Sequence, residues 1–411
     1  MQALYRCCAG LDVHKDTVVA CVRRLDDHGQ AHEEVRTFGT MTGALLALAD
    51  WLAQAGVTHV AMESTGVYWK PVYHVLEGQF ELLLVNAQHI KQVPGRKTDV
   101  KDCAWIAQLL QHGLVKSSLV PPPFQRELRD LTRQRTQLVA EQARVAQRIQ
   151  KALEDANIKL ASVASDVLGA PGRDMLRALI AGTTDPQRLA ELARGKLRTK
   201  IESLRQALLG RVTEHHRFLL RMHLEHYEQL ERWGQEFSQR IEEKLAPFAQ
   251  EAALLQTIPG IAERTAQVLL AEVGPDLTPF PTADHLASWA GVCPGNNESA
   301  GRRRTGRTRK GNQWLRSGLM QMAWSASRAK DSYLSAHFRR LSARRGAKRA
   351  AVAVSHTLLV IVYHVLTRRQ PYKDLGANYL DQLAPERLTQ QLVKRLERLG
   401  HKVTLELPQA A

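Results

Sequence analysis

Short apolar runs separated by polar turns dominate the first part of the chain and predict an α/β domain. The predicted strands cover residues 5–11, 17–24, 35–40, 59–62 and 81–85, and the first two form a β-hairpin around the polar segment 12–16. Helical spacing covers residues 42–56, 67–78 and 97–114, with Thr98 as a candidate N-cap and Gly113 as a stop for the last helix. The order is therefore β-β-β-α-β-α-β-α, and the prolines at 121–123 mark a domain boundary.

Helical periodicity dominates the stretch that follows these prolines. A long helix is predicted over residues 124–163, where seven of nine heptad positions are apolar and Arg135 and Gln142 are the exceptions. After a break rich in glycine and proline, the helical pattern resumes over residues 189–249. The two segments predict a coiled coil or a long antiparallel hairpin, an arm of the kind that most often serves self-association.

The C-terminal part is also predicted to be helical. Residues 254–274 predict two helices around a Pro-Gly-Ile turn, either a helix-hairpin-helix whose turn at Gly260 faces a phosphate or a plain helical hairpin; we favour the first. A short helix is predicted over residues 285–290, and a basic helix over 313–328 places Arg316 away from its apolar face. The apolar run 350–366 is too short and too polar to span a bilayer and predicts a buried helix.

These patterns predict an architecture of α/β plus all-α. The predicted domains are residues 1–123 (α/β), 124–250 (helical arm), 251–370 (C-terminal helical domain) and 371–411 (tail).

Charge is distributed unevenly along the 411 residues, whose net charge is +16. Residues 301–350 contain 15 lysines and arginines against one acid, whereas residues 1–100 contain 9 against 11 acids. The C-terminal third therefore predicts a polyanion partner, DNA or RNA rather than a membrane surface, because no lipidation signal accompanies the basic run. Five cysteines without a CxxC pair, and an N-terminus without a signal-peptide pattern, predict a cytoplasmic protein with reduced thiols and no zinc site.

The stretch 296–312, NNESAGRRRTGRTRKGN, places one serine next to a dense run of cations. Ser299 precedes Ala300 and Gly301, and the following basic residues are Arg302, Arg303, Arg304, Arg307, Arg309 and Lys310. Arginine binds phosphate bidentately and stays charged at any working pH, so a hydroxyl in a small-residue loop among guanidinium groups suits the handling of a phosphodiester. Taken alone, however, the stretch fits a solvated basic loop with an incidental serine better.

Four carboxylates in the α/β domain form a second candidate site. Asp12 follows the first predicted strand, Glu63 follows the fourth, and Asp99 and Asp102 share one face of the next helix. Each acid alone is more often a cap or a surface charge, but their joint placement at strand ends predicts a Mg²⁺ or Mn²⁺ site for phosphoryl transfer. The nearby cations Lys15, Arg96, Lys97 and Lys101 are candidates for holding substrate phosphates.

Several motifs of this chain resemble those of the insertion-sequence-110 transposases. GLDVHK, AMESTG and KTDVKDCAWIAQLL resemble the family's N-terminal DEDD domain, and LLQTIPGIAERTAQVLLAEVG and LASWAGVCPGNNESAGRRRTGRTRKGNQWLRSGL resemble its C-terminal transposase domain. The resemblance covers roughly residues 5–125 and 250–370.

This resemblance implies a DNA recombinase of a bacterial mobile element with a RuvC-like, ribonuclease-H-like N-terminal domain. It implies that Ser299 is the nucleophile, that the four acids hold the metal, and that a bridge RNA pairs with donor and target DNA. It also implies that two domains distant in sequence form one site, either within one chain or between protomers. This chain has Ala300 where many members have glycine; Ser299 stays the best candidate, ahead of Ser288 and Ser317 in predicted helices.

Two other functions stay open on the sequence. In one, the protein is a metal-dependent nuclease or Holliday-junction resolvase that uses water as its nucleophile. In the other, it is a non-catalytic nucleic-acid-binding scaffold. The predicted arm favours a homo-oligomer, a dimer or a tetramer.

Overall fold

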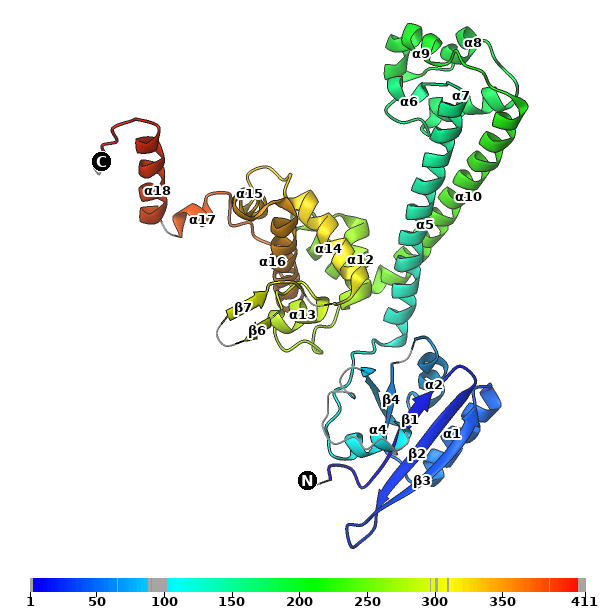
Figure 1. The fold of residues 1–411 in the computed structure, drawn as a ribbon, viewed down its shortest axis with the longest axis vertical. Helices are drawn as coiled ribbons and strands as arrows, with labels where there is room; N and C mark the ends of the chain where they lie inside the picture. Colours follow the sequence, from blue (N-terminus) through cyan, green and yellow to red (C-terminus); the bar gives the residue numbers. More distant parts are fainter. Residues whose placement is uncertain are drawn as a thin grey trace. The chain divides into compact units, whose positions relative to one another are not determined.

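The computed structural model describes residues 3–64, 66–87, 90, 102–295, 297–299, 302–308, 310–383 and 385–405, with only the backbone of 297–299, 302–305 and 387. The chain forms two compact units, Met1–Pro121 and Pro122–Ala411. Figure 1 shows a sheet with flanking helices in the first unit and helices almost throughout the second. The prediction of an α/β part followed by a helical part is confirmed.

The first unit is built on a mixed five-stranded sheet with the strand order β3-β2-β1-β4-β5. Its strands are β1 (Cys7–Val13), β2 (Thr17–Leu25), β3 (Ala31–Gly39), β4 (His59–Glu63) and β5 (Glu81–Val85). The strands β1, β2 and β3 pair antiparallel, whereas β4 lies parallel to β1 and β5 parallel to β4. The first strand runs two residues further than predicted, so Asp12 belongs to the strand and not to the turn.

Helices cover both faces of this sheet. The face formed by Ala9, Leu11 and Val13 packs against α1 (Thr42–Gln54) and α2 (Trp69–Leu76). The other face packs against α4 (Asp102–Gln111), whose apolar side chains contact Cys8 and Ala61. Gly10 permits this close approach, because a Cβ atom there would lie 2.3 Å from the carbonyl oxygen of Cys103.

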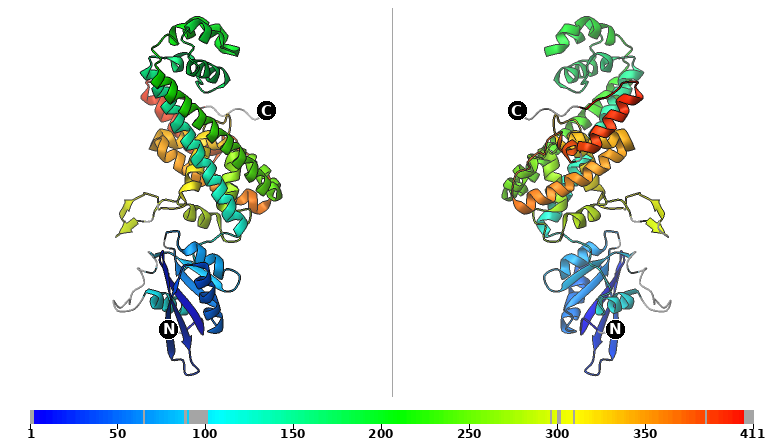
Figure 2. Two further views of the ribbon diagram at one scale, coloured as in Figure 1. Left: turned by 90° about the vertical axis from the view of Figure 1, so that its right-hand side faces the viewer. Right: turned by 90° about the vertical axis from the view of Figure 1, so that its left-hand side faces the viewer.

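In the second unit, α5 (Pro123–Asp155) and α10 (Glu214–Leu245) form a long antiparallel hairpin, hereafter the arm. Figures 1 and 2 both show the two helices side by side. Lys244 pairs with Glu127 at one end, and His216 Nε2 lies 2.9 Å from Asp155 Oδ2 at the other. Both helices of the arm therefore come from the same chain and pair with each other.

Short helices at the far end of the arm replace the end of the first predicted long helix and the start of the second. They are α6 (Leu160–Val163), α7 (Ala170–Ile180), α8 (Pro186–Glu191), the 3₁₀ helix η1 (Gly195–Lys200) and α9 (Ile201–Ala207). The helix predicted to reach residue 163 ends at Asp155, and the one predicted from residue 189 is interrupted before α10. The reason is a close crossing: a Cβ atom on Gly210 would lie 2.5 Å from the carbonyl oxygen of Ala156.

The rest of the second unit packs around one apolar helix, α16 (Ala347–Arg368), as Figure 1 shows. Its neighbours are α11 (Ala249–Gln256), α13 (Ala283–Ala290), α14 (Gln313–Ala326) and α15 (Tyr333–Arg345). The same region contains η2 (Ala246–Phe248), which contacts α11, and α12 (Glu263–Val273), which contacts α11 and α14. The helix extends beyond the predicted run 350–366 at both ends, and by length and composition only it is long and apolar enough to cross a membrane, which corrects the prediction that this segment is too short and too polar. Val354, Leu358 and Val362 are nevertheless fully buried in the helical core, as predicted for a buried helix.

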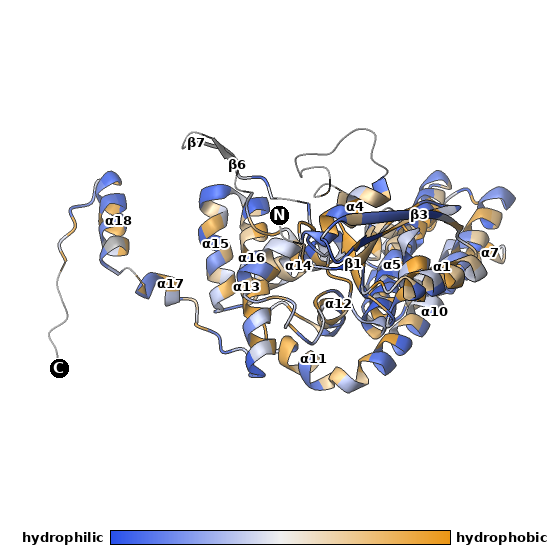
Figure 3. Ribbon diagram, turned by 90° about the horizontal axis from the view of Figure 1, so that it is seen from below, coloured by the Kyte–Doolittle hydropathy of each residue, from blue (hydrophilic) through white to orange (hydrophobic). Residues whose placement is uncertain are grey.

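The predicted tail contains two further helices, α17 (Tyr379–Gln382) and α18 (Pro385–Arg398). Figure 3 shows both hydrophilic and hydrophobic residues around the turns of α15 and α18.

Candidate functional site

The sheet register places two of the predicted carboxylates side by side. Leu11 of β1 pairs with Met62 of β4, so the next residues, Asp12 and Glu63, lie at the same level on adjacent parallel strands. Side chains alternate between the two faces of a strand. Because Gly10 and Ala61 face α4, Asp12 and Glu63 belong to that same face.

The direction of α4 brings a third carboxylate to this edge. The thiol of Cys8 donates to the carbonyl oxygen of Ala107, and Gly10 packs against Cys103, so β1 runs from Cys8 towards the N-terminus of α4. Asp102 is the first residue of that helix. We call Asp12, Glu63 and Asp102 the acidic corner; it lies at the ends of two strands and at the positive end of a helix dipole, which favours negative charge.

His14 is a neighbour of the acidic corner that sequence reasoning missed. Its Nε2 lies 3.2 Å from Asp12 Oδ2, and its side chain is 59% exposed. The available signal was the Asp-x-His spacing, which places two side chains on one side of an extended chain. Within the described ranges, no group of three or more histidine, cysteine, aspartate or glutamate side chains could hold a metal ion.

Several predicted site residues lie outside the described residues, namely Arg96, Lys97, Asp99, Lys101 and Arg309. Their predicted roles stay predictions. Lys15 is exposed beside the acidic corner, and its carbonyl oxygen accepts a hydrogen bond from Thr40 Oγ1.

The predicted loop around Ser299 is a β-hairpin, which corrects the sequence interpretation. Strands β6 (Asn297–Ser299) and β7 (Arg302–Thr305) pair antiparallel, with Ser299 opposite Arg302. Backbone pairing continues beyond the two strands, where the Gly295 amide donates to the Arg307 carbonyl oxygen at 3.0 Å. Ser299 is thus the last residue of β6, and Arg302, Arg303 and Arg304 belong to the strand that pairs with it.

The base of this hairpin is fixed to the helices on either side. A Cβ atom on Gly311 would lie 2.5 Å from the carbonyl oxygen of Ala290, so only glycine fits there. Asn312 caps α14, because its Oδ1 accepts from the amides of Trp314 and Leu315. Arg316 donates to Thr308 Oγ1 at 3.2 Å, which gives Arg316 a structural contact, and its nucleic-acid contact stays a prediction.

A buried glutamate connects the hairpin base to the arm. Glu272 of α12 is fully buried and accepts two hydrogen bonds from Arg133 of α5, at 2.7 and 2.8 Å. Asn312 Nδ2 donates to the same carboxylate at 2.6 Å, and Arg129 Nε lies 3.5 Å from it. We call these residues the Glu272 clamp. Sequence reasoning missed it, although a single acid in the apolar run LLAEVG was a signal.

Gly260 has a packing role in the structure. Its φ is +92°, and a Cβ atom would lie 2.6 Å from the carbonyl oxygen of Met322 in α14. The turn between α11 and α12 is therefore pressed against α14, and a phosphate contact at Gly260 stays a prediction. Arg307 and Lys310 are exposed.

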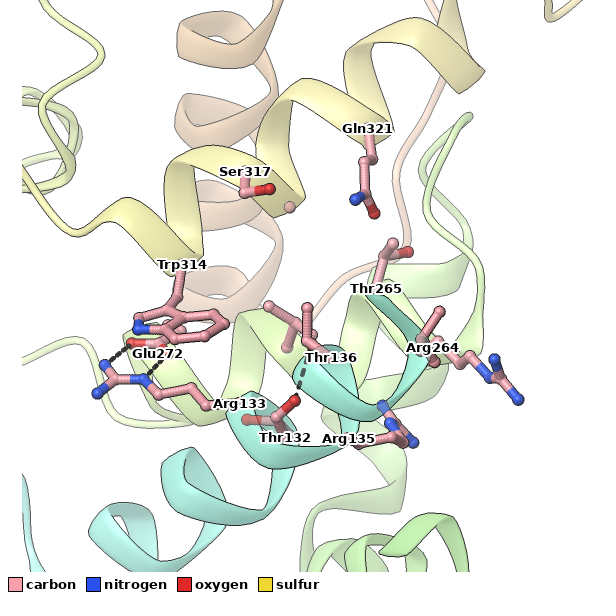
Figure 4. A pocket seen from close by; sticks show the side chains of 13 residues that line it. Thr132, Arg133, Arg135, Thr136, Arg264, Thr265, Glu272, Trp314, Ser317 and Gln321 are labelled. Carbon is pink, nitrogen blue, oxygen red and sulfur yellow. Dashed lines mark hydrogen bonds and ion pairs between the residues drawn. The ribbon is translucent and has the colours of Figure 1, made fainter. Parts of the chain in front are cut away.

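A cavity of about 190 Å³ lies between α5, α12 and α14. Figure 4 shows Ser317 and Gln321 of α14 on one side and Thr136 of α5 opposite them, with Arg133 and Glu272 paired beside Trp314. No sequence pattern predicted this cavity, because its lining comes from three segments distant in the chain.

Two family models match the chain. Residues 9–158 match the model of the IS110 DEDD transposases, described as "Transposase", and residues 252–339 match the model described as "Transposase IS116/IS110/IS902 family". Together they cover more than half of the chain, and they include both the acidic corner and the Ser299 hairpin. The chain belongs to the IS110 family of transposases.

Curated relatives of this IS110-family chain agree with the assignment. The "Pilin gene-inverting protein" of Moraxella bovis is 32% identical over 124 residues, which are 29% of this chain and 38% of that protein. Its Moraxella lacunata counterpart matches to the same extent. The "Insertion element IS110 uncharacterized 43.6 kDa protein" of Streptomyces coelicolor is 54% identical over 46 residues, 11% of each chain. The chain thus spans about 38% of the length of the Moraxella relatives.

Proposed function

We propose that this protein is a DNA transposase that excises and inserts a bacterial insertion sequence by metal-assisted serine attack on DNA phosphodiesters. Membership of the IS110 family supports DNA recombination, as does the similarity to proteins named for inverting a pilin gene. The observation that carries the proposal is the acidic corner, because the strand register brings Asp12 and Glu63 together beside the helix that begins with Asp102.

The first unit fits a ribonuclease-H-like, RuvC-like fold. The strand order 3-2-1-4-5, with three antiparallel strands followed by two parallel ones, supports this assignment. In the proposed site Asp99 completes the set begun by Asp12, Glu63 and Asp102. Four carboxylates offer only hard oxygen ligands, which fit Mg²⁺ or Mn²⁺.

The proposed reaction uses a hydroxyl from the second unit. When bound, the metal supplies Lewis-acid stabilisation of the charge that develops on the scissile phosphate. The Ser299 hydroxyl loses its proton and attacks phosphorus, so a bond from Oγ to phosphorus forms while the bond to the departing strand oxygen breaks. That oxygen takes up a proton and leaves as a strand-end hydroxyl. A strand-end hydroxyl of a new partner then reverses the step and releases serine.

Cations of both units would position the phosphates. Lys15, Arg96 and Lys97 would serve the acidic corner, and Gly260 and Arg316 would contact the backbone beside the hairpin. The hairpin cations are Arg302, Arg303, Arg304, Arg307, Arg309 and Lys310. Phosphate contacts position a protein on DNA without reading its sequence, so we assign sequence choice to a bridge RNA that pairs with donor and target DNA.

We further propose that the protein acts as a homo-oligomer, a dimer or tetramer through the arm, on the DNA of a bacterial cytoplasm. The helix-hairpin-helix role of α11 and α12 belongs to this proposal.

A covalent-adduct trap tests the serine assignment. Full-length protein is incubated with Mg²⁺ and a labelled donor DNA that carries the element's ends, and is then denatured and separated on a gel. We expect a protein–DNA adduct that is absent from Ser299→Ala and present in the matched control Ser288→Ala, whose serine is exposed on α13. An adduct that persists in Ser299→Ala would contradict the assignment.

Two other outcomes identify the alternative functions. Cleaved DNA ends without any adduct would favour a metal-dependent nuclease or junction resolvase that uses water, because the acidic corner lies within one unit. Transposition in cells that is unchanged by Asp12→Asn would favour a non-catalytic scaffold.

A further inference from the structure

The cavity between α5, α12 and α14 has a neighbour between α5 and α10, and the two share part of their lining. The first has a volume of about 190 Å³ and the second about 240 Å³. Both are lined by Arg135, Val139 and Arg264. We call the two cavities together the arm groove. Every residue of the groove lies in the second unit, and neither the acidic corner nor the Ser299 hairpin contributes to it.

Two arginines, Arg135 and Arg264, line both cavities, and neither forms an ion pair with a carboxylate within the described parts of the chain. Arg135 occupies a heptad position of α5, is only 4% exposed, and has Ser238 Oγ as a hydrogen-bond acceptor at 3.4 Å. Figure 4 shows it at the same end of the cavity as Arg264. Within the described parts of the chain, no carboxylate lies within 4.0 Å of either guanidinium.

The positive charge of Arg135 is only partly balanced by the negative charges around it. Burial lowers the pKa of the Arg135 guanidinium, and the Arg264 charge lowers that pKa further, against an opposing effect of Glu242 and Glu263. Arginine stays protonated in proteins, so Arg135 cannot avoid the cost of burial and the repulsion from Arg264 by losing its proton. A buried charge without a partner is costly, whereas an anion placed between two guanidinium groups removes the repulsion and uses their free donors.

The two carboxylates that line the groove, Glu272 and Glu231, already have hydrogen-bond partners. Glu272 accepts from Arg133 and Asn312, and Glu231 accepts two hydrogen bonds from Arg173 at 2.7 and 2.9 Å. The arm groove therefore has a positive surplus that its own carboxylates do not cancel.

The remaining lining suits one strand of nucleic acid. Thr136, Ser317 and Gln321 offer hydroxyl and amide groups to a sugar or a phosphate, and Trp314, whose ring has the Arg133 guanidinium 5.8 Å from its centre, adds an aromatic side chain to the lining. Cations with an adjacent aromatic surface are the usual features of single-strand binding sites. A cavity of about 190 Å³ has room for a phosphate and its sugar but not for a duplex.

We propose that the arm groove binds the backbone of a single nucleic-acid strand, with one phosphodiester held between Arg135 and Arg264. The proposal rests on the protein's proposed action on nucleic acid, but it assigns a site outside the reaction centre. A strand in the groove would pass near the base of the Ser299 hairpin, because Trp314 of the lining lies two residues after the Asn312 cap, whose Oδ1 accepts from the Trp314 amide.

Binding to labelled oligonucleotides tests the proposal without any reaction. All measurements use the full chain carrying Ser299→Ala in EDTA, with fluorescence anisotropy of oligothymidylate and oligouridylate at several salt concentrations. Arg264→Gln removes an exposed cation of the groove, and Arg188→Gln removes an exposed cation at the far end of the arm as the matched control. Gln321→Phe fills the groove without changing charge. Circular dichroism checks that every variant is folded.

We expect Arg264→Gln to weaken binding about tenfold and to reduce the slope of log affinity against log salt by about 0.7. Gln321→Phe should weaken binding without changing that slope, and Arg188→Gln should bind like the parent. A preference for oligouridylate or oligothymidylate will tell whether RNA or DNA occupies the groove.

Several results would overturn the proposal. One is unchanged oligonucleotide binding by both Arg264→Gln and Gln321→Phe. Another is protection from heat by inorganic phosphate that depends on Arg264 while oligonucleotide binding does not, which would assign the groove to a small anion. A failed adduct trap with intact, Arg264-dependent binding would contradict the serine chemistry and leave the groove assignment standing.

Discussion

The Glu272 clamp predicts an unusually large effect for a single change of one carboxylate to an amide. In Glu272→Gln the side chain keeps its size but loses its charge, so Arg133 and Arg129 are left near an uncharged group. The amide nitrogen of the new side chain also meets Asn312 Nδ2, a second donor, where an acceptor stood before. The stability of the second unit should therefore fall.

The magnitude follows from the exposure of the two arginines. Removing one partner of a buried ion pair costs about 3–5 kcal/mol. Arg133 is 32% exposed and can recover water, whereas Arg129 is 11% exposed but keeps the carbonyl oxygens of Ala271 and Glu272 as acceptors. We therefore expect the lower end of that range, about 3 kcal/mol. At about 2–4 °C per kcal/mol, the melting temperature falls by roughly 6–12 °C.

Urea denaturation followed by circular dichroism measures the free energy of unfolding of the mainly helical unit. The matched control is Glu243→Gln, which removes an exposed carboxylate paired with Arg240 and should cost less than about 0.5 kcal/mol. Replacing both members of the clamp, Arg133→Met with Glu272→Leu, should be less destabilising than Glu272→Gln alone. A Glu272→Gln protein as stable as the Glu243→Gln control would refute the reasoning.

Three further predictions concern packing, pH and metal. Gly10→Ala should destabilise the first unit by about 1–3 kcal/mol, because the new methyl group meets the backbone of α4. The control Gly43→Ala should not destabilise it, because a Cβ atom there meets no atom within 4 Å. Equal urea midpoints for the two variants would contradict the placement of α4. The hydrogen bonds from Arg173 hold the pKa of Glu231 below its ordinary value of 4.5, so the pair's contribution is fully present above about that pH and is lost as the pH falls through the lowered pKa. Glu231→Gln should thus reduce stability at neutral pH by less than about 1 kcal/mol and match the parent in acid, and a difference that persists in acid would argue against the ion pair. EDTA and Asp12→Asn should each abolish the covalent adduct on donor DNA, and adduct formation in EDTA would rule out the proposed metal.

Local sequence patterns predicted most of the elements because short apolar runs and helical periodicity are local properties. The end of β1 was misplaced because Asp12 is polar, although its backbone pairs with β2. The helices at the far end of the arm were missed for a different reason. Their boundaries depend on the contact between Gly210 and Ala156, which no local pattern contains.

The candidate site was predictable only in part. The positions of Asp12 and Glu63 after apolar runs were visible in the sequence, and the register then placed them side by side. Arg135 interrupted the heptad pattern, but the sequence did not show that this arginine is buried beside Arg264. No prediction from the sequence covered Glu272, whose partners Arg133 and Asn312 lie 139 and 40 residues away along the chain.

The length of the arm sets a fixed distance between its two ends. The 33 residues of α5 rise about 1.5 Å each, so the far end of the arm stands about 50 Å from its first turn, a span of about 15 base-pair steps along B-DNA. The Glu272 clamp connects the base of the arm to the base of the hairpin that carries Ser299. Whatever touches the far end is thereby held at a set distance from the serine, and deleting two helical turns from both α5 and α10 would shorten that distance by about 11 Å.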